Sequence, residues 1–498
     1  MVYNRIGMFF KLFRSMDEKM SEVLRIKNNR VIFSVAIVML IMVLSGATVL
    51  AESPPPDGGG GDMGASQGNA TNIVTNGAFV VDGTTITSNS TNDNIWDNLV
   101  KAFLGIFKIE MESFNVSETG KTYTSTEADQ SAIVVNGSGS LSIDQATVKK
   151  IGGAVSSEEN SNFYGLNAAL LAKNSSRLKL TNTKINTTVN GANAIFATGN
   201  NSRVTAENVE IFTTADSSRG LDATYGGTIL ATSIKITTNG AHCAALATDR
   251  GGGIVTVIKG VFQTAGEGSP GIYSTGTITA NDTTSTATGS EAATIEGKNS
   301  ITLTNSHITG YKKYGVMIYQ STSGDAAEGA GIFNMTGGSI TAKTGPIFYS
   351  TNTVAIFNLE NVKLTGTGTI LKASADNWGN SGSNGANVTL NTKNQVLEGT
   401  IEADSISSLI LNILNKSKLT ATINSNNTAK SVILKLSSDS TWTVTGNSYI
   451  TGLTDEDSSL SNINDNGFTI YYDKTNSANS WLNGKTITLK GGGKLTPI

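Results

Sequence analysis

The sequence predicts an all-β fold, a right-handed parallel β-helix in which coils of about 21–31 residues stack into a solenoid. Three observations predict it: a repeat of short alternating strands, an asparagine that recurs at one register, and a composition with 54 Gly but 6 Pro in 498 residues. A repeat this short cannot bury its own apolar face, so the copies must stack on one another.

The N-terminal segment, residues 1–51, is expected to be a signal peptide or an N-terminal membrane anchor. Residues 31–51 are uncharged and apolar, and seven Lys or Arg residues precede them. Cleavage before Glu52 is the preferred interpretation. The alternative is an uncleaved anchor, because about 20 apolar residues suffice to cross a bilayer. The protein is therefore expected to be secreted or on the cell surface, with membrane contact through this segment alone.

Residues 52–71 follow as a Pro- and Gly-rich stretch, which is typical of a flexible spacer. Residues 72–130 are predicted to form an N-terminal cap and the first irregular coils. Within them, Trp96, Phe103 and Phe107 have helical spacing, so residues 94–111 are predicted to form a short helix and a strand that cover the open end of the core. A helix that binds a membrane surface or a partner is the alternative.

Residues 131–450 are predicted to form the β-helix itself. Each copy of the repeat begins with a small residue followed by alternating apolar positions. Successive copies begin 21 to 31 residues apart, about 26 on average, at Ala168, Ala194, Gly220, Ala244, Gly271, Ala292, Gly315, Pro346, Thr369 and Thr400.

A second strand in most copies ends at an asparagine, and this residue predicts a corner. Asn tolerates the left-handed backbone that a sharp corner requires, and stacked side-chain amides can hydrogen-bond along the solenoid. Ser233, Lys259 and Gly337 depart from the pattern. The predicted structural ladder consists of Asn182, Asn208, Asn305, Asn361 and Asn415.

These short strands, with small or branched inward side chains, resemble the pectate-lyase-like right-handed parallel β-helix over roughly residues 72–450. Residues 451–498 are predicted to be closing coils. Ser440 to Ser448, followed by Leu453, is similar to the closing coils of autotransporter passenger domains, and this resemblance does not imply the export route of those proteins. The chain also looks like the adhesin-like β-helix proteins of microbial surfaces.

One column of side chains is expected to point outward from the first strand of each coil. It is expected to be largely apolar, and so either a contact surface or a surface covered by long loops such as residues 156–164 and 321–329. The predicted members are Leu170, Phe196, Asp222, Leu246, Tyr273, Thr294, Met317, Phe348 and Leu371.

Polar side chains concentrate at one edge of the central coils. They are expected to lie on turns, where they would contribute to a ligand and little to the core. A polysaccharide groove is one interpretation, and a solvated region of mutually paired turns is the other. The candidate ligand-binding residues are Arg219, Asp222, His242, Asp249, Arg250, Tyr273, Glu296 and Lys298.

No catalytic motif is found, and no catalytic residue is assigned. Pectate lyases use clustered Asp residues for calcium, and polygalacturonases use paired carboxylates near a His; neither pattern matches any stretch here, and adjacent Asp pairs are missing from the repeat. The one cysteine, Cys243, excludes an intrachain disulfide and is expected to be a buried structural thiol, because His242 should point to the opposite face.

These observations favour a non-enzymatic, exported scaffold that acts in adhesion or polysaccharide binding. The expected partner is a cell-surface polysaccharide or a protein. A polysaccharide lyase or glycoside hydrolase is the first alternative, and an ice-binding solenoid is less favoured because uneven coils break the required lattice. Without residues 1–51 the chain has 29 basic and 36 acidic residues, which argues against nucleic acid. No cofactor is expected, although Asp455, Glu456 and Asp457 make calcium possible.

Overall fold

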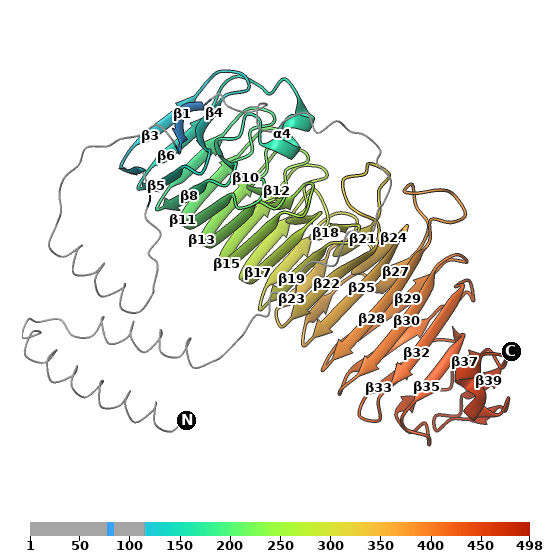
Figure 1. The fold of residues 1–498 in the computed structure, drawn as a ribbon. Helices are drawn as coiled ribbons and strands as arrows, with labels where there is room; N and C mark the ends of the chain where they lie inside the picture. Colours follow the sequence, from blue (N-terminus) through green and yellow to red (C-terminus); the bar gives the residue numbers. More distant parts are fainter. Residues whose placement is uncertain (1–76, 84–113, 115) are drawn as a thin grey trace, which may run out of the picture. The chain divides into compact units, whose positions relative to one another are not determined.

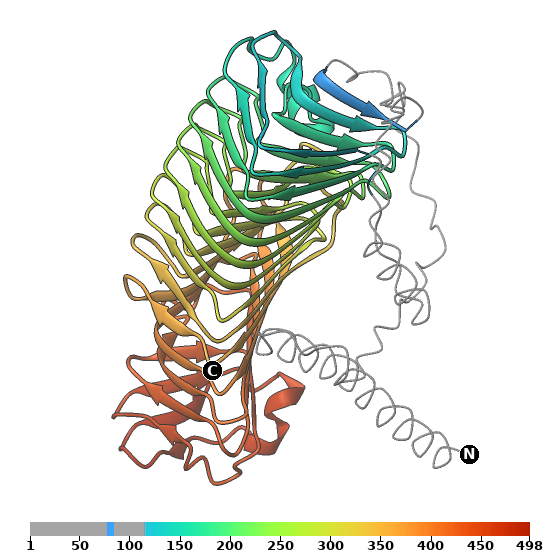
Figure 2. The same ribbon diagram turned by 90° about the vertical axis from the view of Figure 1, so that its left-hand side faces the viewer.

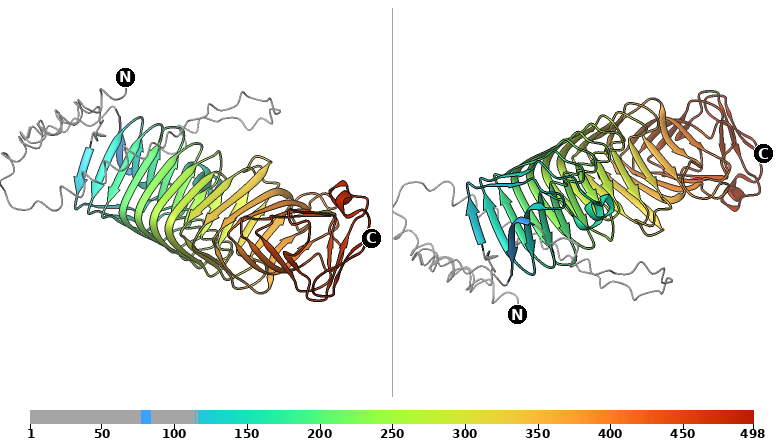
Figure 3. Two further views of the ribbon diagram at one scale, coloured as in Figure 1. Left: turned by 90° about the horizontal axis from the view of Figure 1, so that it is seen from below. Right: turned by 90° about the horizontal axis from the view of Figure 1, so that it is seen from above.

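The computed structural model describes residues 77–83, 114 and 116–498. These residues form a parallel β-solenoid whose coils follow one another in chain order from β1 to β39 (Figure 1). Figures 2 and 3 show the same stack of coils from three further directions. The all-β prediction and the stacking of coils are confirmed. The predicted signal segment, the spacer and the helix at residues 94–111 lie outside the described residues.

Sheet A holds the first strand of each coil, and all of its neighbouring strands are parallel. Its fifteen strands are β1 (Gly77–Asp82), β4 (Ser131–Asn136), β7 (Leu170–Lys173), β10 (Ile195–Thr198), β12 (Leu221–Thr224), β14 (Leu246–Thr248), β16 (Ile272–Ser274), β18 (Ala293–Glu296), β21 (Val316–Tyr319), β24 (Phe348–Thr351), β27 (Thr369–Ala373), β29 (Val396–Ala403), β31 (Lys418–Ile423), β33 (Thr441–Val444) and β36 (Ile463–Asn464).

Sheet B forms the remaining sides of the coils, with a corner that divides it into two bands. Its twenty strands are β2 (Val116–Thr119), β3 (Thr122–Ser125), β5 (Ser140–Asp144), β6 (Thr147–Lys150), β8 (Arg177–Thr181), β9 (Lys184–Thr187), β11 (Arg203–Thr213), β13 (Thr228–Thr238), β15 (Ile254–Thr264), β17 (Thr277–Ala287), β19 (Ser300–Thr304), β20 (His307–Gly310), β22 (Ala330–Thr336), β23 (Ser339–Ala342), β25 (Thr353–Glu360), β26 (Lys363–Thr365), β28 (Ala386–Lys393), β30 (Ser408–Leu414), β32 (Ser431–Leu436) and β35 (Gly452–Asp455).

A small third sheet and two short helices complete the described elements. Sheet C contains β34 (Ser448–Ile450), β37 (Thr469–Tyr472), β38 (Ile487–Thr488) and β39 (Lys494–Pro497), and it ends the stack where closing coils were predicted. The helices are α4 (Glu158–Tyr164) and the 3-10 helix η2 (Ser477–Leu482). No helix in the described part of the chain is both long and apolar enough to cross a membrane.

The core is a continuous apolar column inside the coils. On sheet A it includes Leu170, Ile195, Leu221, Leu246 and Ile272, all without exposed surface. Their alternation with outward side chains explains why the coils stack: each strand supplies one row of branched side chains to a core shared with the next coil.

The predicted outward column is wrong at four positions. Leu170, Leu246, Phe348 and Leu371 pair with core residues of the neighbouring strands and point inward. The assigned starts Ala168, Ala244, Pro346 and Thr369 were each one residue early, and a slip of one residue moves a side chain to the other face. The outward column in this register is Val134, Leu171, Phe196, Asp222, Ala247, Tyr273, Thr294, Met317, Tyr349 and Lys372.

The predicted asparagine corners are confirmed in their backbone conformation. Asn182, Asn208, Asn305, Asn361 and Asn415 all have left-handed φ angles, from 48° to 54°. The departures Ser233, Lys259 and Gly337 adopt it too, as does Asp282. The corner is therefore a property of the coil, and Asn is the residue that fits it most often.

Side-chain stacking at these corners is more limited than predicted. Asn208 donates a hydrogen bond to the side chain of Asn182 at 2.6 Å. A longer run of amides lies on the outer face of sheet B instead, at positions that the sequence analysis did not single out. There each asparagine donates a hydrogen bond to the side chain of the preceding coil at 2.7–3.2 Å: Asn412 to Asn391, Asn391 to Asn358, Asn358 to Asn334, and Asn334 to the hydroxyl oxygen of Thr302.

Candidate functional site

Three long connections cover the outward face of sheet A in the central coils. They are the segment containing α4, residues 321–329 after β21, and residues 374–385 after β27, and Figure 1 shows all three on one side of the stack. Phe196 is fully buried in an apolar cluster with Leu166 and Tyr164. The alternative in which long loops cover the outward column is therefore confirmed, and residues 374–385 are a further cover that was not anticipated.

Helix α4 is held in place by its own caps. Ser157 accepts a hydrogen bond from the backbone N–H of Asn160, and Gly165 ends the helix with φ of 72°. A side chain on Gly165 would collide with Leu171 and Phe196, so glycine is required both by the left-handed conformation and by the close packing on sheet A. This places Asn162 and Phe163 over the central strands.

A buried ionic cluster lies under α4. The Arg219 Nε atom is 2.5 Å from Asp249 Oδ2 and 3.8 Å from Asp222 Oδ2, and Arg219 Nη1 donates to Asn162 Oδ1 at 2.6 Å. Asp222 has no exposed surface, and Asp249 is 5% exposed. Asp222 lies in β12, and Asp249 directly follows β14, the next strand of sheet A. Stacking of these two coils therefore brings the two acids together although they are 27 residues apart in the sequence.

Burial and the neighbouring charges shift the pKa values of Asp222 and Arg219. Burial raises the pKa of Asp222 well above its usual value, the Asp249 carboxylate raises it further, and Arg219 acts in the opposite direction. Burial lowers the pKa of Arg219, but the charges of Asp249 and Asp222 outweigh it, so the pKa is raised overall. Neither oxygen of Asp222 has a hydrogen-bond partner. The cluster therefore contains one cation and two acids that compete for it.

A second buried cluster surrounds Glu296. Its Oε2 atom accepts hydrogen bonds from the Tyr273 hydroxyl at 2.6 Å and the Tyr319 hydroxyl at 2.8 Å, and Ser321 donates to Oε1. Burial is the main cause that raises the pKa of both phenols, and the charge of Glu296 adds to it. Because Ser321 begins the loop of residues 321–329, this carboxylate fixes the loop to sheet A.

Arg250 joins two of the covering segments. Its guanidinium donates through Nε to Asp325 at 3.1 Å and lies 3.8 Å from the centre of the Phe163 ring. Asp325 belongs to the loop of residues 321–329, and Phe163 belongs to α4. The side chain of Arg250 is 29% exposed, so the contact is partly open to solvent.

Between the three covers is a cavity of about 360 Å³ whose floor is sheet A. Tyr273, Thr294, Met317 and Tyr319 form the floor, and turns before the strands add charged groups. The lining residues are Asn162, Phe163, Arg219, His242, Ala244, Asp249, Gly268, Pro270, Tyr273, Ser290, Glu291, Thr294, Lys313, Met317, Tyr319, Asp325 and Trp378. We call this cavity the sheet A cleft.

Four of the eight candidate ligand-binding residues line the cleft: Arg219, His242, Asp249 and Tyr273. Three others support it without lining it: Asp222 next to Asp249, Arg250 through Asp325, and Glu296 beneath the two tyrosines. The eighth, Lys298, is exposed and packs near Gly329, outside the cleft lining. Arg219 and Asp249 lie on turns as expected and are paired with each other, but the expectation that this region is solvated is wrong for them, because both are buried.

Several residues of the cleft were missed by sequence reasoning. Trp378 is 37% exposed and its ring centre lies 5.0 Å from that of Tyr319. Glu291 is 5% exposed, and Lys313 Nζ lies 3.7 Å from one of its carboxylate oxygens. The sequence does contain one signal for this site, a Trp in an insertion between two coils. A Trp in a Gly- and Ser-rich loop is not expected to pack in the core, so it indicates a surface contact.

The remaining candidates in this region have structural roles or stay predictions. Cys243 is fully buried, and its Sγ accepts from the Ser218 backbone N–H at 3.0 Å and donates to Ala241 O at 3.1 Å, so the predicted structural thiol is confirmed. Within the described residues there is no group of three or more His, Cys, Asp or Glu side chains that could hold a metal ion. The carboxylate of Asp457 accepts hydrogen bonds from Ser459 and Ser461. Calcium binding there stays a prediction.

Comparison of the chain with protein-family models, with curated proteins and with solved structures gave no match. The functional interpretation therefore depends on the fold and on the sheet A cleft.

Proposed function

We propose that the protein is an exported surface scaffold that binds a polysaccharide in the sheet A cleft. The observation that carries the proposal is the lining of that cleft: the aromatic rings of Trp378, Tyr319 and Tyr273 lie beside ionic groups such as Lys313 and Glu291. Sugars present apolar ring faces and hydroxyl edges, so they bind where aromatic surfaces adjoin fixed hydrogen-bonding groups.

The dimensions and rigidity of the cleft support this proposal. Its volume of about 360 Å³ is at the lower end of the roughly 300–1,000 Å³ typical of small-molecule sites. The buried clusters of Arg219 and Glu296 hold its floor and covers in place before any ligand arrives. A preorganised site loses less conformational entropy on binding, which favours recognition of a flexible chain such as a polysaccharide.

The test is binding of the full-length protein to a glycan array, with two matched variants. Trp378→Ala removes the exposed ring of the cleft, and Trp481→Ala removes a tryptophan of nearly equal exposure, 37% against 36%, in η2 of the last coils. We expect Trp378→Ala to weaken binding about tenfold, equivalent to about 1.4 kcal/mol, and Trp481→Ala to leave it unchanged. Equal effects of both variants, or no glycan bound, would contradict the proposal.

Export is a separate part of the proposal, supported by the basic and apolar character of residues 1–51. Cell fractionation should recover the protein outside the cytoplasm. If the segment is cleaved, N-terminal sequencing should find a mature chain that begins near Glu52. Recovery of the intact chain in the cytosol would refute this part and leave the cleft proposal open to its own test.

Glycoside hydrolysis is the second candidate function, and one observation favours it. The carboxyl groups of Asp249 and Glu291 both line the cleft, and most glycosidases act with a pair of carboxyl groups at the scissile bond. The array-selected polysaccharide should then release reducing ends, and Asp249→Asn should abolish the release. Saturable binding without products would favour the scaffold.

A further inference from the structure

The band of sheet B that precedes the corner presents a continuous uncharged face to solvent. Eight of its strands form this face, β13, β15, β17, β19, β22, β25, β28 and β30, and Figure 1 shows them side by side. The first outward column along these strands is Thr228, Ile254, Thr277, Ser300, Ile332, Ile356, Thr389 and Ile410. The residue two positions further along each strand forms a second column, from Leu230 to Asn412. We call these two columns of eight residues the sheet B face.

The composition of the sheet B face differs from that of the rest of the chain. It contains six Thr, four Ile, four Asn, one Ser and one Leu, and thus no charged and no aromatic side chain, although charged residues make up 15% of the chain. Charge returns on the flanking strands, with Arg203 on β11 and Lys435 on β32. Every residue of the face is at least partly exposed, and Ile254 is 41% exposed.

The coils are uneven in length, but this face is regular. Residues that are hydrogen-bonded along the second column are 21 to 33 positions apart, yet the strands keep one register from β13 to β30. The two longest separations, 32 and 33, contain residues 321–329 and 374–385, which cover sheet A. The additional residues therefore lie in connections on the sheet A side. The expectation that uneven coils break a regular lattice is wrong for this face.

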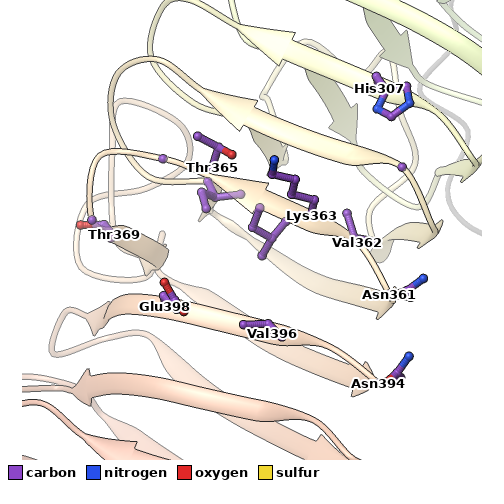
Figure 4. Close-up of a pocket in the computed structure, with 14 residues that line it drawn as sticks. His307, Asn361, Val362, Lys363, Thr365, Thr369, Asn394, Val396 and Glu398 are labelled. Atoms are coloured by element: carbon purple, nitrogen blue, oxygen red, sulfur yellow. The ribbon is translucent and has the colours of Figure 1, made fainter.

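The band that follows the corner is interrupted and carries charge. Strand pairing stops between β26 and β29, since β29 pairs with β27 and β31 instead. A cavity of about 770 Å³ lies at this break, and Figure 4 shows Lys363 and Glu398 on the two strands beside it. The regular, uncharged array is therefore a property of the band before the corner.

The side chains of the sheet B face are held in fixed positions. Ten of the sixteen are Thr or Ile, whose branched Cβ restricts χ1. The four Asn side chains donate hydrogen bonds along the second column at 2.7–3.2 Å, as far as Thr302. The backbone sets two repeats, about 4.8 Å between strands and roughly 6.6 Å between alternate residues of one strand. Seven steps between strands make the array roughly 34 Å long.

We propose that the sheet B face binds ice. Water forms cages around the methyl groups of Thr and Ile, and Thr hydroxyls and Asn amides hydrogen-bond this water at fixed positions. The two repeats of the face are similar in size to those of water molecules on a prism face of ice, so the water layer on the array can join the crystal lattice. A charged side chain would keep a hydration shell of its own, and aromatic rings would favour a sugar surface. The face contains neither.

Adsorption of the full-length wild-type protein to ice tests the proposal. A protein that covers the ice surface lowers the freezing point below the melting point and is retained in a slowly grown crystal. We expect both results, together with inhibition of ice recrystallisation. Exclusion of the protein from the crystal, with freezing and melting points that coincide, would overturn the proposal.

Two matched variants on strand β17 test the location of the site. Thr279 lies in the second column of the sheet B face, and Thr286 lies on the same strand after the corner; both are outward and half-buried. Thr279→Lys places a hydrated charge within the array, so the protein concentration needed to inhibit recrystallisation should rise at least tenfold. Thr286→Lys should leave this concentration unchanged. Equal effects of the two variants would contradict the assignment to this face.

Asn334→Asp covers the case in which Thr279→Lys fails to fold. It has nearly the same shape and keeps the oxygen that accepts from Asn358, but adds a charge, so it should also raise the required concentration at least tenfold. Binding to microcrystalline cellulose or chitin that Asn334→Asp abolishes, without adsorption to ice, would assign the face to a crystalline polysaccharide and overturn the proposal. Trp378→Ala should leave ice adsorption unchanged, because Trp378 lines the sheet A cleft, so failure of either proposal leaves the other intact.

Discussion

Replacement of Arg219 by Met is the perturbation that best probes the support of the sheet A cleft. Met keeps an unbranched side chain of similar length but removes the charge and all donors. The guanidinium contacts Asp249 at 2.5 Å, Asp222 at 3.8 Å and Asn162 at 2.6 Å. The change therefore leaves two carboxyl groups, 5% and 0% exposed, without their cation.

The expected loss is about 3–5 kcal/mol in the free energy of unfolding, the range measured when one partner of a buried ion pair is removed. The loss should depend on pH. Burial already raises the pKa of Asp222, and the loss of Arg219 removes the charge that lowers it, so its folded-state pKa rises further above that of the unfolded chain. The contribution of Asp222 to stability is then greatest below about pH 4 and is lost as pH rises through the folded-state value. The deficit should thus be small in acid and largest near neutral pH.

Urea unfolding of the full-length protein at pH 4.5 and pH 7.5 measures this difference. Arg203→Met is the matched control, because Arg203 is exposed on β11, and it should change stability by less than about 0.5 kcal/mol at either pH. An Arg219→Met variant as stable as Arg203→Met, or a deficit that does not vary with pH, would refute the assignment of this cluster.

Three further outcomes follow from the coils and their cores. Asn208→Val should cost roughly 1–3 kcal/mol in thermal or urea unfolding, because a β-branched residue is strained at φ of 54°, whereas Asn186→Val in strand β9 should be nearly neutral. Burial lowers the pKa of Lys150 to about 8, so the unfolded chain binds more protons between about pH 8 and 10.5. Stability should therefore rise with pH across that window, by on the order of 3 kcal/mol relative to Lys150→Met. Burial raises the pKa of the Cys243 thiol to about 11, so a thiol reagent at pH 8 should label Cys243 in urea but not in the folded protein; equal labelling in both states would contradict its burial.

The parts of the fold that repeat were predictable from the sequence, because they recur in register. The left-handed corner was visible at Asn182, Asn208, Asn305, Asn361 and Asn415, since few other residues tolerate that conformation. Whether a side chain of sheet A points into the core or outward was harder to predict. Where a coil begins with two small residues, as at Ala168-Ala169, the pattern does not fix the register, and Leu170 was placed on the wrong side.

The candidate site was predictable in location but not in construction. Arg219, Asp249 and Tyr273 share an edge because coils stack, and this much follows from the repeat. Their burial depends on α4 and on residues 321–329 and 374–385, which are insertions without a repeat to place them. The shared contact of Asp222 and Asp249 with Arg219 also required the register of two coils, because the two acids are 27 positions apart and form no local motif.

Hydroxyl-radical footprinting of Trp378 tests the central claim most directly, with Trp481 as an internal reference in the same molecule. The two tryptophan residues are 37% and 36% exposed, so they should oxidise at similar rates in the free protein. If a polysaccharide binds in the sheet A cleft, an oligosaccharide selected on the array should protect Trp378 and leave Trp481 unchanged, as read by mass spectrometry of the peptides. Protection of Trp481 alone, or unchanged oxidation of Trp378 at a saturating oligosaccharide concentration, would contradict binding in the cleft.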